Sequence, residues 1–215
     1  MKKIFLLLCL IVTTGFCFSA CNKAEKKGLP QAEIEQKQLP EFKDYLDAFI
    51  NNDATAIEKL KKGEIAPCKS VSSLIQYYLQ DKDEDTCIRI VKLALENKGK
   101  IVYGLDMSGP LIESCKLNYY KLTEYLLTTD AKKYIDHHAS QYAPALFWAM
   151  LNGNIELVEL LLKNGADPNS ETHYGRTYMD EITEFIADKR ISPETGKQLK
   201  ELLIKYGYKE QTSDN

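Results

Sequence analysis

The sequence contains few of the residues on which metal sites, nucleic-acid binding and disulfide-built folds depend. It has three histidines and six cysteines in 215 residues, too little cysteine for a fold held together by disulfides. Basic residues are not in excess either: 28 Lys and Arg against 31 Asp and Glu give a net charge of −3, which argues against nucleic acid as a partner. With 44 % hydrophobic and 27 % charged residues, the composition predicts one or two globular domains.

Motifs that would support catalysis or metal binding are also missing from the sequence. His137 and His138 are adjacent, so their side chains point apart, and no cluster of ligands lies at a suitable spacing. The acidic segment 81–85 resembles the first half of a calcium loop, but Thr86 and Lys92 stand where that loop needs Gly and Glu. We therefore predict no metal, no cofactor and no enzymatic activity, and we expect segment 81–85 to cap the helix that follows it.

The first twenty residues are typical of a secretory signal. Two lysines precede an unbroken apolar run at 4–12, which is too short for a transmembrane helix. Two processing routes remain open. A cut by ordinary signal peptidase after Ala20 would place the bulky Phe18 where a small side chain is preferred. The segment Phe18-Ser19-Ala20-Cys21 instead resembles the lipobox of bacterial lipoproteins, which implies that Cys21 is lipidated and becomes the mature N-terminus.

Residues 21–39 are rich in Lys, Glu and Gln and have almost no apolar side chains, so we expect a flexible tether. Without Lys2 and Lys3, 26 basic and 31 acidic side chains remain, a net charge of −5, which adds no attraction to anionic lipid. By resemblance to enteric lipoproteins, Asn22 in place of Asp favours the outer membrane, facing the periplasm, if the host has two membranes.

From residue 40 onward, apolar residues recur at helical spacing, and no strand-like alternation of useful length occurs, so we predict an all-α fold. Asp53 is expected to cap a helix that ends at Gly63. We predict five units of two helices each, over 41–63, 71–96, 109–130, 144–166 and 177–208. Among the expected core residues of the second unit are Val71, Leu74, Ile75, Tyr78, Leu79, Ile88, Val91 and Leu95.

The segment 144–169 resembles an ankyrin repeat. Leu146 and Ala149 stand where that repeat has the Leu and first Ala of its T-P-L-H-x-A opening, and Gly165 suits a left-handed position at the end of the second helix. Asn118 replaces the turn Gly one unit earlier. The last unit has about nine extra residues between its helices, with Ser192-Pro193 as the expected helix start.

The resemblance implies an ankyrin-type helical solenoid over residues 40–208, with a tail at 209–215, whose concave groove binds partners. In the ankyrin motif the residue before the first Ala faces this groove. Trp148 holds that place, Glu113 holds it one unit earlier, and Lys116 and Leu151 follow three residues later on their helices. We therefore predict Glu113, Lys116, Trp148 and Leu151 as partner-binding residues. The alternative for Trp148 is a place in the core.

Three cysteines lie beyond the anchor: Cys68, Cys87 and Cys115. An odd number allows at most one bridge within this set. Cys87 and Cys115 are expected at the turn ends of adjacent units, so they are the pair that we predict if any disulfide forms. Cys115 also fits a small buried position of the first helix, where a thiol behaves as an apolar group.

These observations together predict a monomeric, lipid-anchored solenoid that binds an unidentified protein in the bacterial cell envelope. The alternative is an immunity protein that neutralises a secreted antibacterial toxin, since small exported ankyrin proteins sometimes have that role and an acidic chain suits a basic toxin. The fold itself does not name the partner.

Overall fold

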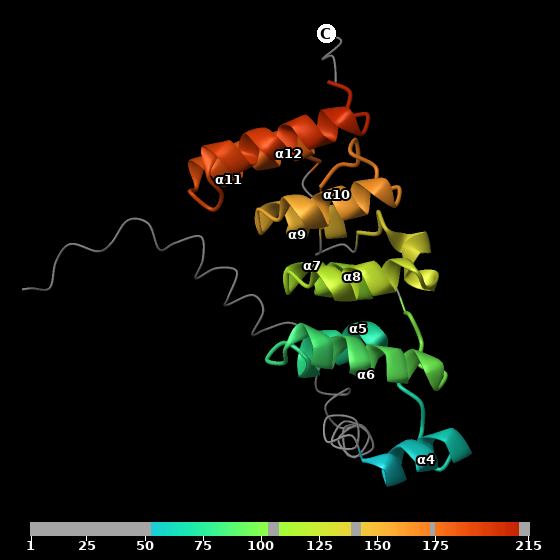
Figure 1. Cartoon of the computed structure of the whole chain (residues 1–215). Coiled ribbons are helices and arrows are strands. Elements are labelled where there is room, and N and C mark those ends of the chain that lie inside the picture. Colours follow the sequence, from blue (N-terminus) through green and yellow to red (C-terminus); the bar gives the residue numbers. More distant parts are fainter. Residues whose placement is uncertain (1–52, 103–107, 139–142, 173–174, 211–215) are drawn as a thin grey trace, which may run out of the picture. The chain divides into compact units, whose positions relative to one another are not determined.

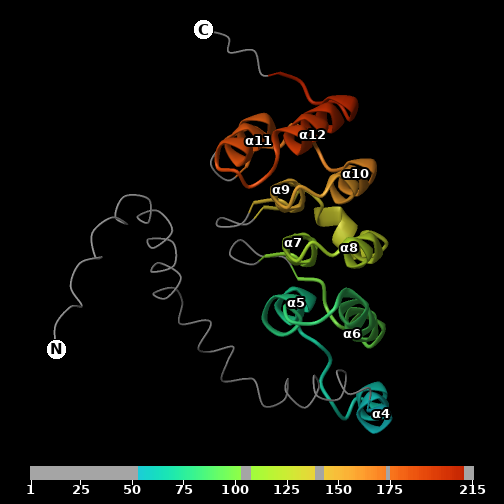
Figure 2. The ribbon, with the colours of Figure 1, turned by 60° about the vertical axis from the view of Figure 1, so that its left-hand side comes forward.

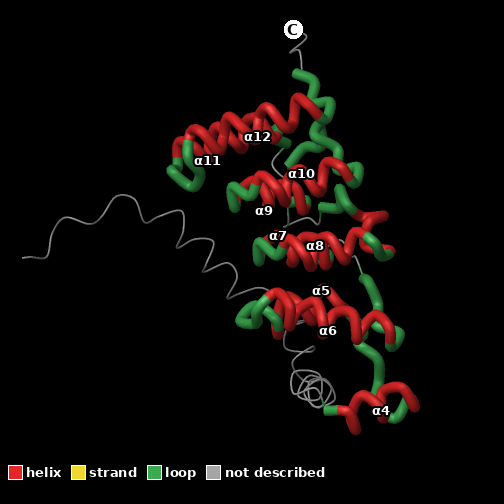
Figure 3. Tube along the Cα trace, in the orientation of Figure 1, coloured by secondary structure: helices red, strands yellow, loops and turns green. Residues whose placement is uncertain are grey.

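The computed structural model describes residues 53–102, 108–138, 143–172 and 175–210. The chain divides into two compact units, 1–44 and 45–215, and every described residue belongs to the second. The predicted signal peptide, Cys21, the tether and the first helix of the first unit lie outside the described residues. In the described ranges the structure is helical and contains no strand, so the all-α prediction is confirmed (Figure 3).

The described helices run in chain order as follows: α4 (Ala54–Lys62), α5 (Val71–Tyr78), α6 (Glu84–Glu96), α7 (Pro110–Lys116), α8 (Tyr120–Leu127), a 3-10 helix η1 (Asp130–Tyr134), α9 (Ala145–Leu151), α10 (Ile155–Lys163), α11 (Tyr178–Ala187) and α12 (Pro193–Lys205) (Figure 1).

Four helix pairs stack on one another. The pairs are α5–α6, α7–α8, α9–α10 and α11–α12, and they fall within the four predicted units from residue 71 onward. The first helices of the pairs, α5, α7, α9 and α11, contact one another in sequence and form one column, which we call the inner helices. The second helices, α6, α8, α10 and α12, form the other column, the outer helices (Figure 2).

The core runs through the stack between the two columns. Leu74, Leu111, Leu146 and Ile182 on the inner helices are at most 1 % exposed. Helices of seven to ten residues are marginal in isolation, so these inner helices depend on burial against their neighbours. The predicted face of α6 was partly wrong. Val91 is buried, but Ile88 and Leu95 are only half-buried, and the smaller Cys87 and Ala94 occupy the core with Ile90.

Polar caps fix where the helices begin. Asp53 accepts hydrogen bonds from the backbone N–H groups of Thr55 and Ala56, at 2.8 and 3.4 Å, as predicted for the start of α4. Asp83 accepts from the backbone N–H and hydroxyl of Thr86, so the acidic segment 81–85 caps α6. Such caps satisfy backbone donors that have no partner within the helix.

Helix α8 takes its cap from the preceding unit. Tyr119 at its N-cap makes no side-chain capping bond. Instead, the backbone N–H of Leu122 donates to Glu84 Oε1 of α6 at 3.1 Å, and Lys121 Nζ lies 3.2 Å from Asp85 Oδ1. The turn edges of the second and third units are therefore joined by polar contacts as well as by packing.

Residues in the turns adopt the left-handed backbone conformation at the positions where the repeat pattern predicts it. Asn118 has φ 59° and Gly153, its counterpart one unit later, has φ 66°, so Asn118 does replace a turn glycine. Its Oδ1 accepts from Asn154 Nδ2 at 2.7 Å, which links the two turns. Gly165 has φ 102°, in agreement with the prediction for that position.

The extra residues of the fifth unit lengthen its helices. Helix α11 has ten residues and α12 has thirteen, whereas α9 has seven and α10 has nine. Ser192 caps α12 by accepting from the backbone N–H of Thr195 at 3.0 Å, and Pro193 is the first helical residue, as predicted. The insertion thus forms mostly regular helix instead of a longer loop.

All three described cysteines are free and buried, so the suggested Cys87–Cys115 disulfide is absent from the structure. Each thiol has its own local contact. Cys87 Sγ lies 3.4 Å from the carbonyl oxygen of Leu79, and Cys115 Sγ lies 3.8 Å from Thr123 Oγ1. Cys115 is 0 % exposed, so it fills the small buried position expected for it.

Helices long and apolar enough to cross a bilayer do not occur among the described residues.

A carboxylate joins the fourth unit to the fifth. Glu159 of α10 accepts from Lys205 Nζ at 2.9 Å and from the hydroxyl of Tyr206 at 3.2 Å, and Lys163 Nζ lies 3.3 Å away. These donors, with Lys205 first, lower the pKa of Glu159 to about 2. A carboxylate with a lowered pKa stabilises the fold above its ordinary pKa, and that contribution disappears as the pH falls through the folded value.

We predict that Glu159→Gln reduces the acid sensitivity of the fold. Between pH about 4.5 and about 2, the free energy of unfolding should fall less in the variant than in the native chain, and the two should converge near pH 2. Urea denaturation at several pH values measures this. Glu124→Gln, an exposed change on outer helix α8, is the control. Parallel pH profiles for the native chain and Glu159→Gln would contradict the prediction.

Candidate protein-binding face

Corresponding positions of the inner helices form two rows across the stack. Counting from the first residue of each helix, the fourth-position row consists of Leu74, Glu113, Trp148 and Glu181. The seventh-position row consists of Tyr77, Lys116, Leu151 and Glu184. Residues three apart lie on the same side of a helix, so the two rows share one side of the inner column, which we call the inner face.

Trp148 is half-buried. Its exposure is therefore intermediate between that of an open groove residue and that of a core residue, the two alternatives for this side chain. Its indole Nε1–H donates to the carbonyl oxygen of Ala143 at 3.2 Å. Its ring meets Phe147 edge to face, with centroids 5.5 Å apart. The indole is therefore held in one orientation while part of it stays accessible.

Lys116 connects Trp148 to the preceding unit. Its ammonium lies 5.0 Å from the centroid of the Trp148 ring, within the range of a cation–π contact. The same ammonium donates to Glu113 Oε1 at 3.0 Å. Three of the four predicted binding residues thus form one chain of contacts from α7 to α9. Leu151, half-buried, lies one turn beyond Trp148 on α9.

Glu113 does not lie open in a groove, as we had predicted from the motif. It is only 3 % exposed. A buried carboxylate is tolerated when a cation pairs with it, and Lys116 supplies that cation from one turn further along α7. The side chain of Lys116 itself keeps 21 % exposure, so the accessible part of this ion pair is positive.

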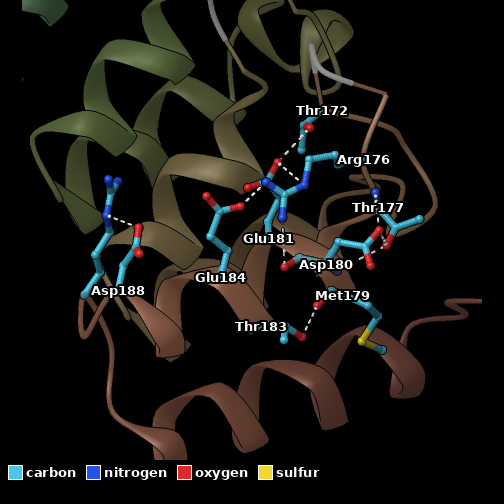
Figure 4. Close-up of polar contacts among 10 residues, drawn as sticks. Thr172, Arg176, Thr177, Met179, Asp180, Glu181, Thr183, Glu184 and Asp188 are labelled. Carbon is cyan, nitrogen blue, oxygen red and sulfur yellow. Dashed lines mark hydrogen bonds and ion pairs between the residues drawn. The ribbon is translucent and has the colours of Figure 1, made fainter. Parts of the chain in front are cut away.

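The fifth unit repeats this arrangement at Glu181, which the sequence analysis missed. Glu181 is 4 % exposed, accepts from the hydroxyl of Thr172 at 2.9 Å, and lies 3.8 Å from Arg176 Nε (Figure 4). Arg176 also pairs with Glu184, and that contact raises the pKa of its guanidinium further. Glu181 lies 33 residues after Trp148, a spacing close to the repeat period that could have identified it.

The start of α11 is fixed by a reciprocal cap. The hydroxyl of Thr177 accepts from the backbone N–H of Asp180 at 3.2 Å, and the Asp180 carboxylate accepts from the backbone N–H of Thr177 at the same distance (Figure 4). The Thr177 donors lower the pKa of Asp180. Phe185 of α11, which is buried, meets Phe147 of α9 edge to face at 5.3 Å, so aromatic packing joins the fourth unit to the fifth.

The described residues offer little for catalysis or metal binding. No group of three or more His, Cys, Asp or Glu is placed to hold a metal in this part of the chain. Burial raises the pKa of Cys68 to about 11 and that of both Cys87 and Cys115 to about 12. These thiols stay protonated at neutral pH and are poor nucleophiles.

Stacked pairs of short helices, with glycine or asparagine turns and inner helices that begin 33 to 39 residues apart, define a helical repeat protein of the ankyrin type. A family model described as "Ankyrin repeats (3 copies)" matches residues 48–172, more than half of the chain. The chain therefore belongs to the ankyrin-repeat family, whose repeats act as scaffolds for protein–protein interaction.

The chain is also similar to a curated protein of Drosophila melanogaster, "Protein fem-1 homolog CG6966". The two are 29 % identical over 106 residues, which cover 43 % of this chain and 16 % of the fly protein. The similarity thus spans about a sixth of that protein's length.

We predict that Trp148→Ala lowers the free energy of unfolding by about 1–2 kcal/mol, because it removes one hydrogen bond, one aromatic contact and one exposed cation–π contact from a half-buried site. Equilibrium urea denaturation measures the loss. A loss of about 3–5 kcal/mol would mean a core residue, and no loss would mean a side chain without structural contacts. Ile204→Ala, a change at an outer-helix residue that is 62 % exposed, should cost less than about 0.5 kcal/mol.

Proposed function

We propose that this protein is a lipid-anchored ankyrin solenoid that binds another protein through its inner face in the bacterial cell envelope. The observation that carries the proposal is the fixed, half-accessible indole of Trp148 between Lys116 and Phe147. Tryptophan is enriched among the residues that dominate binding energy at interfaces. An aromatic side chain that is already held in place loses little conformational entropy on binding, which favours affinity.

The anchor is supported by the sequence. Cys21 follows a small residue in Phe18-Ser19-Ala20-Cys21, and residues 22–39 provide a polar tether between lipid and repeats. Each buried methylene of an acyl chain contributes about 0.8 kcal/mol, so several chains on one cysteine would hold the protein firmly. With Asn22 after the cysteine, we place the protein at the outer membrane, facing the periplasm, in a host with two membranes.

We predict that Cys21→Ser abolishes incorporation of labelled palmitate when the full chain is expressed in bacteria, because no other cysteine lies in a lipobox-like context. Cys17→Ser, a change within the same signal, is the matched control and should keep the label, since the bulky Phe16 precedes Cys17. Gel fluorography measures the incorporation. Labelled palmitate on the Cys21→Ser variant would rule out the lipoprotein assignment.

We predict that Leu151→Ala reduces capture of the partner from detergent-solubilised membranes by about tenfold or more, since the proposal makes Leu151 one of the few residues that carry the binding energy, and truncating such a residue costs about 2 kcal/mol. Quantitative mass spectrometry compares the full chain with each variant. Ile204→Ala on the outer helix α12 is the matched control. Equal recovery with Leu151→Ala, or no specific capture at all, would contradict the proposed function.

The identity of the captured protein also tests the narrower alternative of toxin neutralisation. A secreted toxin among the captured proteins would favour an immunity role, and a resident envelope protein would favour a scaffold.

A further inference from the structure

The inner face carries very little accessible charge over three consecutive units. Helices α5 and α9 contain no charged residue at all, and α7 contains only Glu113 and Lys116. Because Glu113 is buried, Lys116 is the accessible charged side chain of these three helices. Its ammonium contacts the half-buried Trp148, and Tyr77, which is 58 % exposed, and the half-buried Leu151 hold the same row position on the two neighbouring inner helices.

The position of the Lys116 ammonium is fixed by two neighbouring groups, the carboxylate of Glu113 and the ring of Trp148. Glu113 Oε1 holds the Lys116 ammonium at 3.0 Å, and the Trp148 ring lies on another side of the same ammonium at 5.0 Å. A free lysine side chain would lose considerable rotamer entropy on binding a partner. In the folded protein Lys116 has already lost part of this rotamer entropy, so less is lost on binding, and Glu113 acts as a positioning residue for Lys116.

The fifth unit limits where an acidic group could bind. Glu184 occupies the seventh position of α11, as Lys116 does on α7, and its side chain is 46 % exposed. Arg176 is shared between Glu181 and Glu184, so these three groups together keep one negative charge. A carboxylate brought near α11 would meet that charge, whereas one brought near α7 would meet the ammonium of Lys116, whose single partner carboxylate is buried. The two ends of the inner face therefore favour one orientation of a charged segment.

We infer that the inner face of α5, α7 and α9 binds a segment of a partner protein in which an acidic side chain is flanked by apolar ones. This inference rests on the proposed function and names the chemistry of its partner. The carboxylate binds the ammonium of Lys116, and the apolar neighbours pack on Tyr77, Trp148 and Leu151.

A phage-displayed library of random dodecapeptides, panned on the immobilised full chain, tests the inference. The selected peptides should be enriched in Asp or Glu next to aromatic or aliphatic residues, and their binding should weaken as the salt concentration rises. Selection of basic or uncharged peptides, or of no peptide, would overturn the inference.

Two variants test the role of Lys116 directly. Lys116→Glu should shift the selection towards peptides that carry Lys or Arg. The double variant Glu113→Gln Lys116→Gln removes the charge pair without leaving a buried carboxylate unpaired, and it should bind the peptides selected by the native chain about tenfold more weakly. Circular dichroism melts verify that each variant is folded.

The control for Lys116→Glu is Lys121→Glu on outer helix α8, which makes the same change in net charge as Lys116→Glu at a side chain that is 62 % exposed. It should leave the selected peptides unchanged. Equal binding by the double variant, or an equal effect of Lys121→Glu, would overturn the inference. If the double variant still captured the cellular partner in full, the proposed function would stand and only this inference would fail.

Discussion

The structure depends on the burial of short helices against their neighbours in the stack. Helices α7 and α9 have seven residues each, about two turns, and cannot persist alone. Each is held by the inner helix before it, the inner helix after it and its own outer helix. Polar contacts then fix the register between units: Asn152 Nδ2 donates to the carbonyl oxygen of Cys115 at 2.8 Å, and Asp167 N–H donates to Asp136 Oδ1 at 2.9 Å. Because the register is fixed, equivalent positions line up in rows.

The helix pairs could be predicted from the sequence because local signals mark their ends. Asp53, Ser192-Pro193 and Gly165 are caps or turns whose conformational preferences do not depend on distant residues. The buried face of α6 was harder to predict. A search for large aliphatic side chains selects Ile88 and Leu95, yet the buried face of α6 consists of residues at i, i+3, i+4 and i+7, namely Cys87, Ile90, Val91 and Ala94. Which face of α6 is buried depends on how the helix is rotated against α5 and α8, and a face that contains small residues such as Cys87 and Ala94 gives only a weak signal in one sequence.

The sequence could predict which residues of the candidate site are at equivalent positions of the repeats, but not which side chains contact one another. The repeat register identified Trp148 and Glu113 as equivalent residues, and the same register extends to Glu181. The register alone could not show that Glu113 is buried, because its burial depends on an ion pair with Lys116 and on packing between units. Nor could it show that the Lys116 ammonium lies over the indole, since a long flexible side chain can adopt many rotamers.

A carboxylate buried with a cation beside it contributes no more to the stability of a helix than an apolar residue of similar size would. Removing a carboxylate from water costs several kcal/mol, and its attraction to a nearby cation often does no more than compensate. Glu113 and Glu181 nevertheless occupy equivalent places on either side of Trp148, and each pairs with a cation: Lys116, three residues later on α7, and Arg176, which precedes α11. In both pairs the carboxylate is the buried member and the cation is the more accessible one. What the Glu113–Lys116 pair provides, and an apolar residue would not, is a cation whose position is fixed before a partner binds. Arg176 differs, because Glu184 pairs with it as well. The same physical arrangement that adds little to stability therefore adds directional charge to an otherwise aromatic and aliphatic surface.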